Sequence, residues 1–499
     1  MMNGTVVQRG VAGLLVVIGL MAGLPAGADE PPASGEPSRA EHASGGTRVH
    51  ATLDVSGELV MPVGGDEAPR RERVEVEATF DFDEWPAMVQ GAAAAGSANA
   101  ATPAARRSYR QAAASMRLGE AKTGTALAED ARDLLVAKCG TTPLPYLADR
   151  FLTGEESDLL EIPFDVLLLD ELLPRQADAA VAVGDAWQIA GDLTAGLLAI
   201  DTIESGGLEA RIERVAEGLA HVGISGMIDG AVDGVPTHVT VQGSFTVPAA
   251  NVAGDDASAD DEAARFGLRG PVSRVAVVIL ERRQASHVAP GFEVEARVLV
   301  EREPLDGRPA AEPAVVEPAL VEQEPPPFPR RRGAGGPGQI WYRDPQGRFD
   351  LVHDIRWRRV ENGANGLVLR LVDRGALVGQ CSITSLPQAA SSTLPSRGDV
   401  QADIERTVAG QIDRIEAAEE TDRPDGLRVV RVVSSGTAGR LPFRRIHYVL
   451  AAEDGSRTNV AFLFEASMQE RFADADRPLI ESLRLPGSRT AAAPGTVRQ

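Results

Sequence analysis

The sequence predicts an α+β protein with two domains. Three observations lead to this class. Residues Leu208–Arg302 contain runs in which apolar and polar residues alternate between short glycine-containing turns, which is typical of an antiparallel meander with one buried face. Residues 303–338 carry nine prolines and no such alternation, so they form a linker and not a sheet or helix. After the linker, strand-like runs and helical spacing occur together, which predicts a smaller domain over 339–486.

The N-terminus, residues 1–28, has the pattern of a signal peptide. Arg9 precedes an apolar run, Val11–Leu24, and the small residues Ala26 and Ala28 form a cleavage site. We therefore expect an exported, periplasmic or extracellular protein with no membrane span in the mature chain. An uncleaved anchor is the alternative. Residues 29–46 are polar and predict a flexible leader.

The first domain, residues 47–302, should begin with a hairpin of Thr47–Met61 and Arg73–Phe82, in which apolar residues recur at every second position. An Ala/Gly/Ser tract, Gly91–Ala105, is predicted to be a loose connection. Arg106–Cys139 stays open, because its alanine content favours a helix while Leu134–Ala137 resembles a strand.

Helical cover for the meander is expected downstream. Thr153 and Glu156 have the spacing of a capping box, so a short helix should run through Leu160. Phe164–Leu173 is predicted to be buried and helical, and Leu193–Ile200 is a second covering segment. Gly184–Trp187 should form a turn that brings in an aromatic anchor. The meander strands are predicted at Leu208–Val215, Ala220–Ile228, Val235–Val247, Val275–Glu281 and Phe292–Val300.

The second domain, residues 339–486, should contain two helices. Asp399–Ala417 has apolar residues at helical spacing, and Met468–Leu483 is the second helix, in which Pro478 should cause a kink or a break. Residues 487–499 are predicted to be a disordered tail. The expected strands are Ile340–Tyr342, Phe349–Val352, Gly366–Val372, Leu377–Thr384, Leu427–Val433, Phe443–Ala451 and Thr458–Glu465.

This second domain resembles the PsbP-like fold. The resemblance depends on an opening Tyr-x-Asp-x-x-Gly-Arg-Phe motif, on a following tryptophan, and on a late strand before a helix that ends in Ile-Glu-Ser-Leu; the residues are Tyr342, Asp344, Gly347, Arg348, Phe349, Trp357, Ala461–Phe464 and Ile480–Leu483. It implies an antiparallel sheet between helices and a non-enzymatic, extracytoplasmic or partner-binding module. The first domain resembles exported, planctomycete-like bacterial proteins with a Gly-Asp-x-Trp turn before a β-meander, a resemblance that adds no activity.

Charge and motif spacing exclude several classes of function. A net charge of −22 argues against nucleic acid or an anionic membrane as the main partner. Gly333–Gly338 spells a dinucleotide-binding motif but lies in the linker after Arg330–Arg332, without the strand and helix that such a site needs. The acidic stretch Asp255–Glu262 lacks the central glycine of a calcium loop. We therefore predict no cofactor, no metal site and no catalytic residue, and leave the binding residues unknown.

Histidines and cysteines give weaker alternatives. His221, His238 or His287 would be the candidates for an unrecognised hydrolase, and His221 could approach His238 across a hairpin. Cys139 and Cys381 are predicted to be buried thiols, with a disulfide between them as the alternative. Trp187, Trp341 and Trp357 are predicted to be core anchors.

Two functional hypotheses remain. The first is an exported interaction or scaffold protein of the cell envelope that binds a protein partner. The second is a carrier for an apolar ligand or lipid, in which Gly223, Gly226 and Gly243 would leave space for a cavity.

Overall fold

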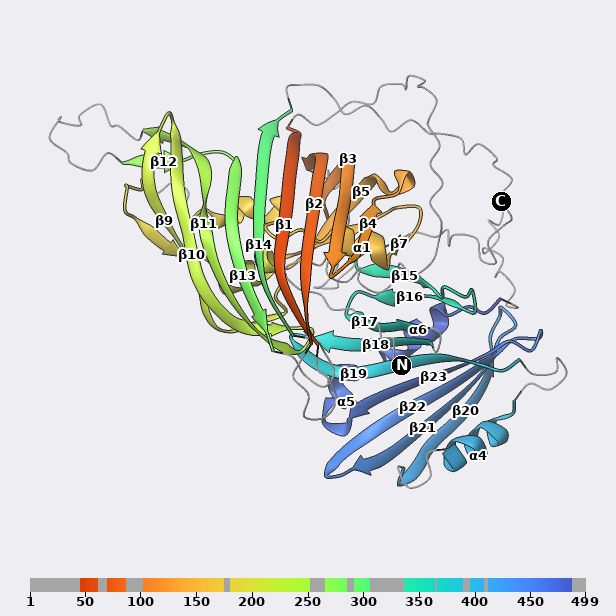
Figure 1. Ribbon diagram of the computed structural model, residues 1–499. Coiled ribbons are helices and arrows are strands. Elements are labelled where there is room, and N and C mark those ends of the chain that lie inside the picture. The colour runs from red at the N-terminus through yellow and green to blue at the C-terminus, as the bar shows by residue number, and fades with distance from the viewer. Residues whose placement is uncertain are drawn as a thin grey trace, which may run out of the picture. The chain divides into compact units, whose positions relative to one another are not determined.

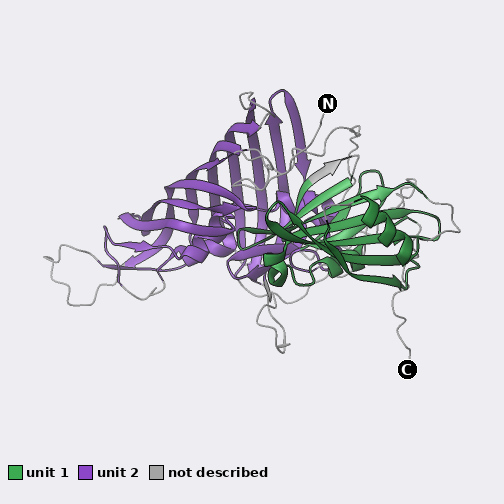
Figure 2. Cartoon of the chain, turned by 90° about the horizontal axis from the view of Figure 1, so that it is seen from below, with its two compact units in different colours: residues 1–7, 322–332, 339–499 green, residues 8–321, 333–338 purple. Residues whose placement is uncertain are grey.

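The computed structural model describes residues 45–61, 70–86, 102–174, 180–251, 265–284, 291–305, 336–363, 366–388, 395–407 and 412–486. The chain divides into two compact units (Figure 2). Unit 2 contains the described residues up to 305 together with 336–338, and unit 1 contains those from 339 to 486. Both are built mainly from antiparallel strands with few helices, which confirms the α+β class.

Unit 2 is organised around one sheet of thirteen strands (Figure 1). Its main path runs β6-β5-β3-β2-β1-β14-β13-β11-β10-β9-β8, with β4 beside β3 and β12 beside β11. The described strands of unit 2 are β1 Thr47–Met61, β2 Arg70–Pro86, β3 Thr102–Leu118, β4 Ala121–Ala126, β5 Asp133–Cys139, β6 Thr142–Tyr146, β7 Leu152–Thr153, β8 Ala186–Gln188, β9 Thr202–Ala216, β10 Leu219–Val232, β11 Val235–Asn251, β12 Phe266–Leu268, β13 Arg274–Arg283 and β14 Gly291–Pro304.

The alternating sequence of β1 explains its place at the centre of this sheet. Val49, Leu53 and Val55 are buried, whereas His50 and Asp54 between them are exposed, because successive side chains of a strand point to opposite faces. β1 pairs with β2 on one side and with β14 on the other. The predicted hairpin and all five meander strands are confirmed.

The stretch Arg106–Cys139, which the sequence left open, consists of strands and one 3-10 turn, η2 (Glu129–Ala131). β3 begins at Thr102, so the prediction of a loose connection up to Ala105 is wrong at its C-terminal end. The small side chains Ala112 and Ala114 are buried on the inner face of β3. Tertiary packing therefore overrides the helical preference of alanine here.

Short helices cover the inner face of the sheet: α1 (Gly154–Leu159), α2 (Val166–Leu169), the 3-10 turn η3 (Asp170–Leu172) and α3 (Gly191–Leu198). The predicted capping box is present, since the Thr153 hydroxyl accepts from Glu156 N–H and the Glu156 carboxylate accepts from Thr153 N–H. Both expected covering segments are confirmed.

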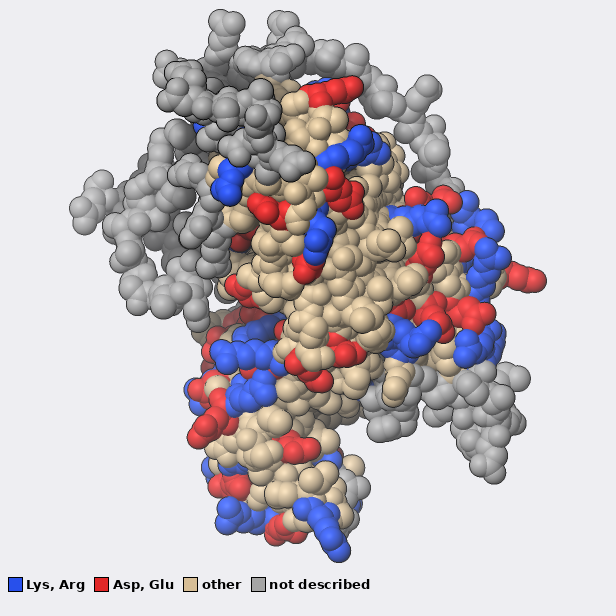
Figure 3. All heavy atoms as spheres, turned by 90° about the vertical axis from the view of Figure 1, so that its left-hand side faces the viewer, with Lys and Arg blue, Asp and Glu red and all other residues tan. Residues whose placement is uncertain are grey.

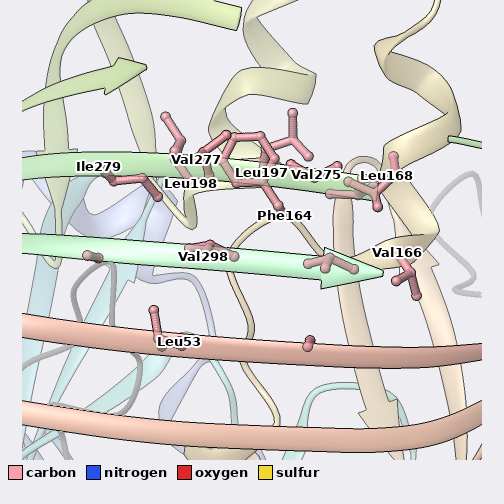
Figure 4. Close-up of a cluster of buried hydrophobic side chains, with 14 of the residues drawn as sticks. Leu53, Phe164, Val166, Leu168, Leu197, Leu198, Val275, Val277, Ile279 and Val298 are labelled. Carbon is pink, nitrogen blue, oxygen red and sulfur yellow. The ribbon is translucent and has the colours of Figure 1, made fainter. Parts of the chain in front are cut away.

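Phe164 is the main apolar anchor of this cover. Figure 4 shows its ring with Leu197 and Leu198 of α3 against Val275 and Val277 of β13. Its backbone has φ 57°, a left-handed conformation that costs an L-residue about 1–2 kcal/mol. Complete burial of a phenylalanine side chain contributes about 1.5–3 kcal/mol, and the Phe164 N–H also donates to the Leu197 carbonyl at 2.8 Å. Packing therefore offsets the backbone strain.

Unit 1 has a seven-stranded antiparallel sheet of order β17-β18-β19-β23-β22-β21-β20, and β15 pairs with β16 separately. The helices α5 and α6 lie with the larger core on one face, and α4 packs its Val400 and Ile404 against Val430 and Val432. The elements are β15 Gln339–Arg343, β16 Asp350–Asp354, β17 Trp357–Gly363, β18 Gly366–Asp373, β19 Ala376–Leu386, α4 Arg397–Thr407, β20 Arg414–Asp422, β21 Arg428–Ala438, β22 Leu441–Ala451, β23 Arg457–Glu465, η4 Ala466–Met468, α5 Gln469–Phe472 and α6 Asp476–Ser482.

Both predicted helices of unit 1 need correction. Asp399–Ala417 is not one helix, because its described part contains the helix α4 up to Thr407 and the start of the strand β20 from Arg414. Ile412 and Ile415 nevertheless pack against the same small cluster as α4. Their apolar character is therefore explained by burial in this cluster and not by membership of a helix. The second helix is interrupted at Ala473, whose φ is 44°. Pro478 lies within the first turn of α6, where proline is tolerated.

Several predictions lie outside the described residues. These are the signal peptide, most of the leader, the acidic stretch, nearly all of the linker and the tail. No helix within the described ranges has the length and apolar character needed to cross a membrane.

Candidate protein-binding face

Large apolar side chains of β10, β13 and β14 lie on the outer face of the unit 2 sheet. The exposed fractions are 63% for Met227, 48% for Leu280 and 37% for Val278. Met227 is opposite Thr240, and Thr240 is opposite Leu280, so the three strands bring these side chains onto one stretch of the sheet. The half-buried Leu299 lies diagonally across from Val278. We call Met227, Val278, Leu280 and Leu299 the outer apolar patch.

The outer apolar patch has a rim of paired charges. Arg297 pairs with Glu295 at 2.8 Å, and Arg211 pairs with Glu209 at 3.0 Å. Arg282–Glu293 and Arg274–Glu301 are further ion pairs on this face. Such exposed pairs contribute at most about 1 kcal/mol each to stability. Their main effect is that the rim is close to neutral although the chain carries a net charge of −22.

Figure 3 shows how charged side chains are distributed over one face of the protein. Basic and acidic side chains lie beside one another there, and neither sign forms a field of its own. A surface of this kind does not attract a partner by net charge over a long range. The rim of the outer apolar patch also consists of ion pairs, so recognition there would depend on shape and apolar contact.

The two candidate histidines that the structure describes, His221 and His238, lie far apart. His221 is opposite Thr246 and His238 is opposite Asp229, so the two are separated by eight positions along β10, roughly 27 Å at the rise of a strand. The expectation that they approach each other is wrong. His287 lies outside the described residues.

His238 does lie beside a carboxylate. Its Nδ1 is 2.7 Å from Asp229 Oδ1, and the Ser205 hydroxyl donates to Asp229 Oδ2 at 3.1 Å. These hydrogen bonds from His238 and Ser205 lower the pKa of Asp229. A nucleophilic triad needs histidine between serine and carboxylate, whereas here the carboxylate is in the middle. All three side chains are exposed, which favours a surface polar cluster. In the part of the chain that the structure describes, no three potential ligands are grouped to hold a metal ion.

Buried charges in unit 2 hold the covering helices. The Arg107 guanidinium donates to both Asp165 oxygens at 2.8 and 2.6 Å and to Glu84 at 2.7 Å. Asp165 also caps α2 through Leu167 N–H. Burial raises the pKa of Glu84, an effect that Arg107 opposes. This cluster joins β2, β3 and α2, so we assign it a structural role.

The predicted tryptophan anchors are confirmed. Trp341 and Trp357 are buried, and the half-buried Trp187 packs against the unit 2 core and donates to the Leu172 carbonyl at 2.8 Å. Both cysteines are free thiols. Cys381 is buried, and burial raises its pKa well above the usual value. Cys139 is exposed, so the prediction of two buried thiols is wrong for that residue.

The three meander glycines permit close approach between chain segments. A Cβ at Gly226 would lie 2.0 Å from the Gly207 carbonyl oxygen, and one at Gly243 would lie 2.3 Å from the Ala276 carbonyl oxygen. At Gly223 it would meet the Glu213 carboxylate at 2.3 Å. Neighbouring backbone thus explains the missing side chains of Gly226 and Gly243 without a ligand cavity, whereas the atom near Gly223 is the end of an exposed glutamate side chain.

Comparisons with known proteins give a limited result. No family model and no curated protein matches the chain. The solution structure of cyanobacterial PsbP from Synechocystis is similar over 30% of this chain and 92% of its own, with 15% identity and a TM-score of 0.24. Lipovitellin is similar over 55% of this chain and 27% of its own, with 8% identity and a TM-score of 0.27. OccK5 from Pseudomonas aeruginosa gives a TM-score of 0.11.

The PsbP structure is thus similar to 30% of the chain, at low identity. Scores at this level say nothing about activity or partner. The resemblance of the first domain to planctomycete-like proteins stays a prediction.

Sequence reasoning missed the outer apolar patch, although a signal was present. Val275–Leu280 is an uninterrupted apolar run, whereas a strand with one solvated face should alternate. Such a run indicates that both faces meet apolar surroundings. Only the strand register shows that Val278 and Leu280 point away from the covering helices.

Proposed function

We propose that the protein is an exported, non-enzymatic interaction or scaffold protein of the cell envelope, which binds a protein partner through the outer apolar patch. The observation that carries this proposal is the grouping of Met227, Val278 and Leu280 on one solvent-exposed face. Single exposed apolar residues are ordinary, but contiguous ones with a polar rim are typical of interaction surfaces. Burial of apolar area releases roughly 25 cal/mol per Å², so covering these side chains favours association.

Other features agree with this proposal. The signal-peptide pattern of residues 1–28 favours export to the periplasm or the exterior. The serine, aspartate and histidine on the outer face are arranged in an order that does not suit nucleophilic catalysis. We therefore propose that the protein binds a partner and does not catalyse a reaction.

The carrier hypothesis is the second candidate, and it is disfavoured by the packing of unit 2. Phe164, Leu168, Leu197 and Leu198 are each at most 1% exposed and belong to the same core as the inner face of the sheet. A ligand would have to displace them. Native mass spectrometry of the full chain separates the two hypotheses, since extra mass that organic solvent removes would favour the carrier.

The test of the interaction proposal is site-specific photo-crosslinking in the source organism. A photoreactive amino acid replaces Met227 or Leu280 in the full chain, and Glu77 serves as the control position. Glu77 is exposed on the same face but lies on β2, away from the patch. We expect a discrete protein adduct at Met227 and at Leu280 and none at Glu77.

The substitution Val278→Asp should reduce the adduct at Met227, because it places a charge in the middle of the contact. An equal adduct at all three positions, or none at Met227 and Leu280, would refute the proposed binding face.

A further inference from the structure

Two buried side chains with unpaired polar atoms lie in unit 1, on the sheet face that α4 covers. Ser434 of β21 is 0% exposed, His447 of β22 is 9% exposed, and the Ser434 Oγ and His447 Nε2 have no hydrogen-bond partner among the described residues. Buried polar atoms normally have a partner. Two such atoms on neighbouring strands indicate that a partner of polar character belongs between them.

Arg445 adds a cation to this group. It is directly opposite Ser434 and two residues from His447, so the three side chains share one face. The guanidinium is half-buried and lies 5.6 Å from the centre of the Phe443 ring, and burial lowers its pKa. No carboxylate of the described residues pairs with it, whereas the adjacent Arg444 on the other face pairs with Glu416.

The surroundings indicate which anion fits. A guanidinium offers two parallel N–H donors, which match the two oxygens of a carboxylate. The Ser434 hydroxyl supplies a third donor. Leu463, which is opposite Arg445 and 38% exposed, lies on the side where the cluster is open, so an aliphatic group attached to the carboxylate would meet an apolar surface.

We propose that Arg445, Ser434 and His447 form a binding site for the carboxylate group of an organic ligand. The carboxylate accepts hydrogen bonds from the Arg445 guanidinium and from the Ser434 hydroxyl, and His447 adjoins it, held by its hydrogen bond to Asn459. A small organic acid and the C-terminus of a polypeptide both present this group, and the experiment below distinguishes them. This site does not depend on the function proposed for the outer apolar patch.

The experiment uses the full chain with ¹³C-labelled histidine rings. The chain has seven histidines, so the His447 signal can be assigned by its loss in H447Q. The chain is titrated at constant ionic strength with sodium hexanoate, hexanamide, or an N-acetylated dipeptide with a free or an amidated C-terminus. We expect a saturable shift of the His447 signal with a free carboxylate and no shift with either amide, and a Kd on the order of 1 mM.

Variants test the role of each donor. Arg445→Met should weaken binding about ten-fold or more, because it removes charge-assisted hydrogen bonds, and Ser434→Ala should weaken it by less. Arg440→Met is the matched control, since Arg440 is exposed at the β21–β22 turn of the same unit. Hydrogen exchange of β22 verifies that each variant is folded, and Arg445→Lys provides a milder change if Arg445→Met is not.

The ligand that gives the tighter titration identifies the source of the carboxylate. A response only to the dipeptide with a free C-terminus supports the site and assigns it to a polypeptide end. The absence of a shift, equal shifts with hexanamide, or equal affinity in Arg445→Met would overturn the proposal and leave internal water as the partner of Ser434 and His447.

Discussion

Acidification should destabilise unit 1 through His447. Burial and the positive charge of Arg445 lower the pKa of His447 from its ordinary value of 6.5 to about 4, while the hydrogen bond to Asn459 acts in the opposite direction. The other neighbours on this face are uncharged: Ser434, Val432 and Ala461. Between these two pH values, His447 is therefore neutral in the folded chain and protonated in the unfolded chain.

The two pKa values determine the sign and the size of the change in the free energy of unfolding. Above pH 6.5 both states carry neutral His447, and its contribution to stability is fully present. As the pH falls from 6.5 toward 4, the unfolded state gains the proton first, so the free energy of unfolding decreases. A shift of about 2.5 pKa units corresponds to about 3 kcal/mol in full, of which about 2 kcal/mol is lost by pH 5.

This loss can be measured in the intact chain by hydrogen exchange. Mass spectrometry of peptides from β22 reports the opening of unit 1 alone. Other groups also titrate, so the comparison is between the wild type and His447→Gln. Glutamine keeps a hydrogen-bonding side chain for Asn459 but does not titrate. Between about pH 7 and pH 5, the opening free energy of β22 should fall about 2 kcal/mol more in the wild type than in the variant.

His50→Gln is the control, because His50 is exposed on β1 of unit 2. It should follow the wild type in the β22 peptides. The reasoning fails if His447→Gln loses as much stability as the wild type, since the acid sensitivity would then come from other groups.

Three further predictions concern single residues. Arg107→Met should destabilise unit 2 by about 3–5 kcal/mol in denaturant unfolding, because Asp165 would remain as an unpaired buried charge; a loss below about 1 kcal/mol would contradict the structural role. Thr153→Ala should cost about 1 kcal/mol through loss of the α1 cap, visible as faster exchange in 153–160 and contradicted by unchanged exchange there. A thiol reagent should modify Cys139 in the native chain and Cys381 only after unfolding; rapid native labelling of Cys381 would show that its part of the core is open.

Local sequence signals predicted those parts of the fold in which one physical cause dominates. Strict alternation located β1 at Thr47–Met61, because a strand with one buried face needs an apolar side chain at every second position. The Thr153–Glu156 spacing predicted a cap that depends on only four residues. In these places the local preference and the tertiary environment agree.

The sequence was misleading where apolar spacing has two explanations. Val400, Ile404, Ile412 and Ile415 recur at intervals that suit one helix, yet the last two belong to a different segment that packs on the same cluster. Shared burial, and not a continuous helix, produces the pattern. The alanine-rich β3 shows the converse case, since a helix-forming composition is held as a strand by pairing on both sides.

Both proposed sites depend on the register between strands, which is why neither was predicted. Leu280 and Ile279 are similar residues in one apolar run, but only Leu280 faces outward, beside Met227 across Thr240. Ser434 and Arg445 are eleven positions apart in the sequence and become neighbours only through the pairing of β21 with β22. The register of a strand pair is set by the turn and by the buried residues, so the outer residues themselves do not show which of them will be neighbours. A binding surface on a sheet is therefore harder to find in a sequence than the sheet itself, because alternation reveals the inner face and the outer residues are left without a pattern.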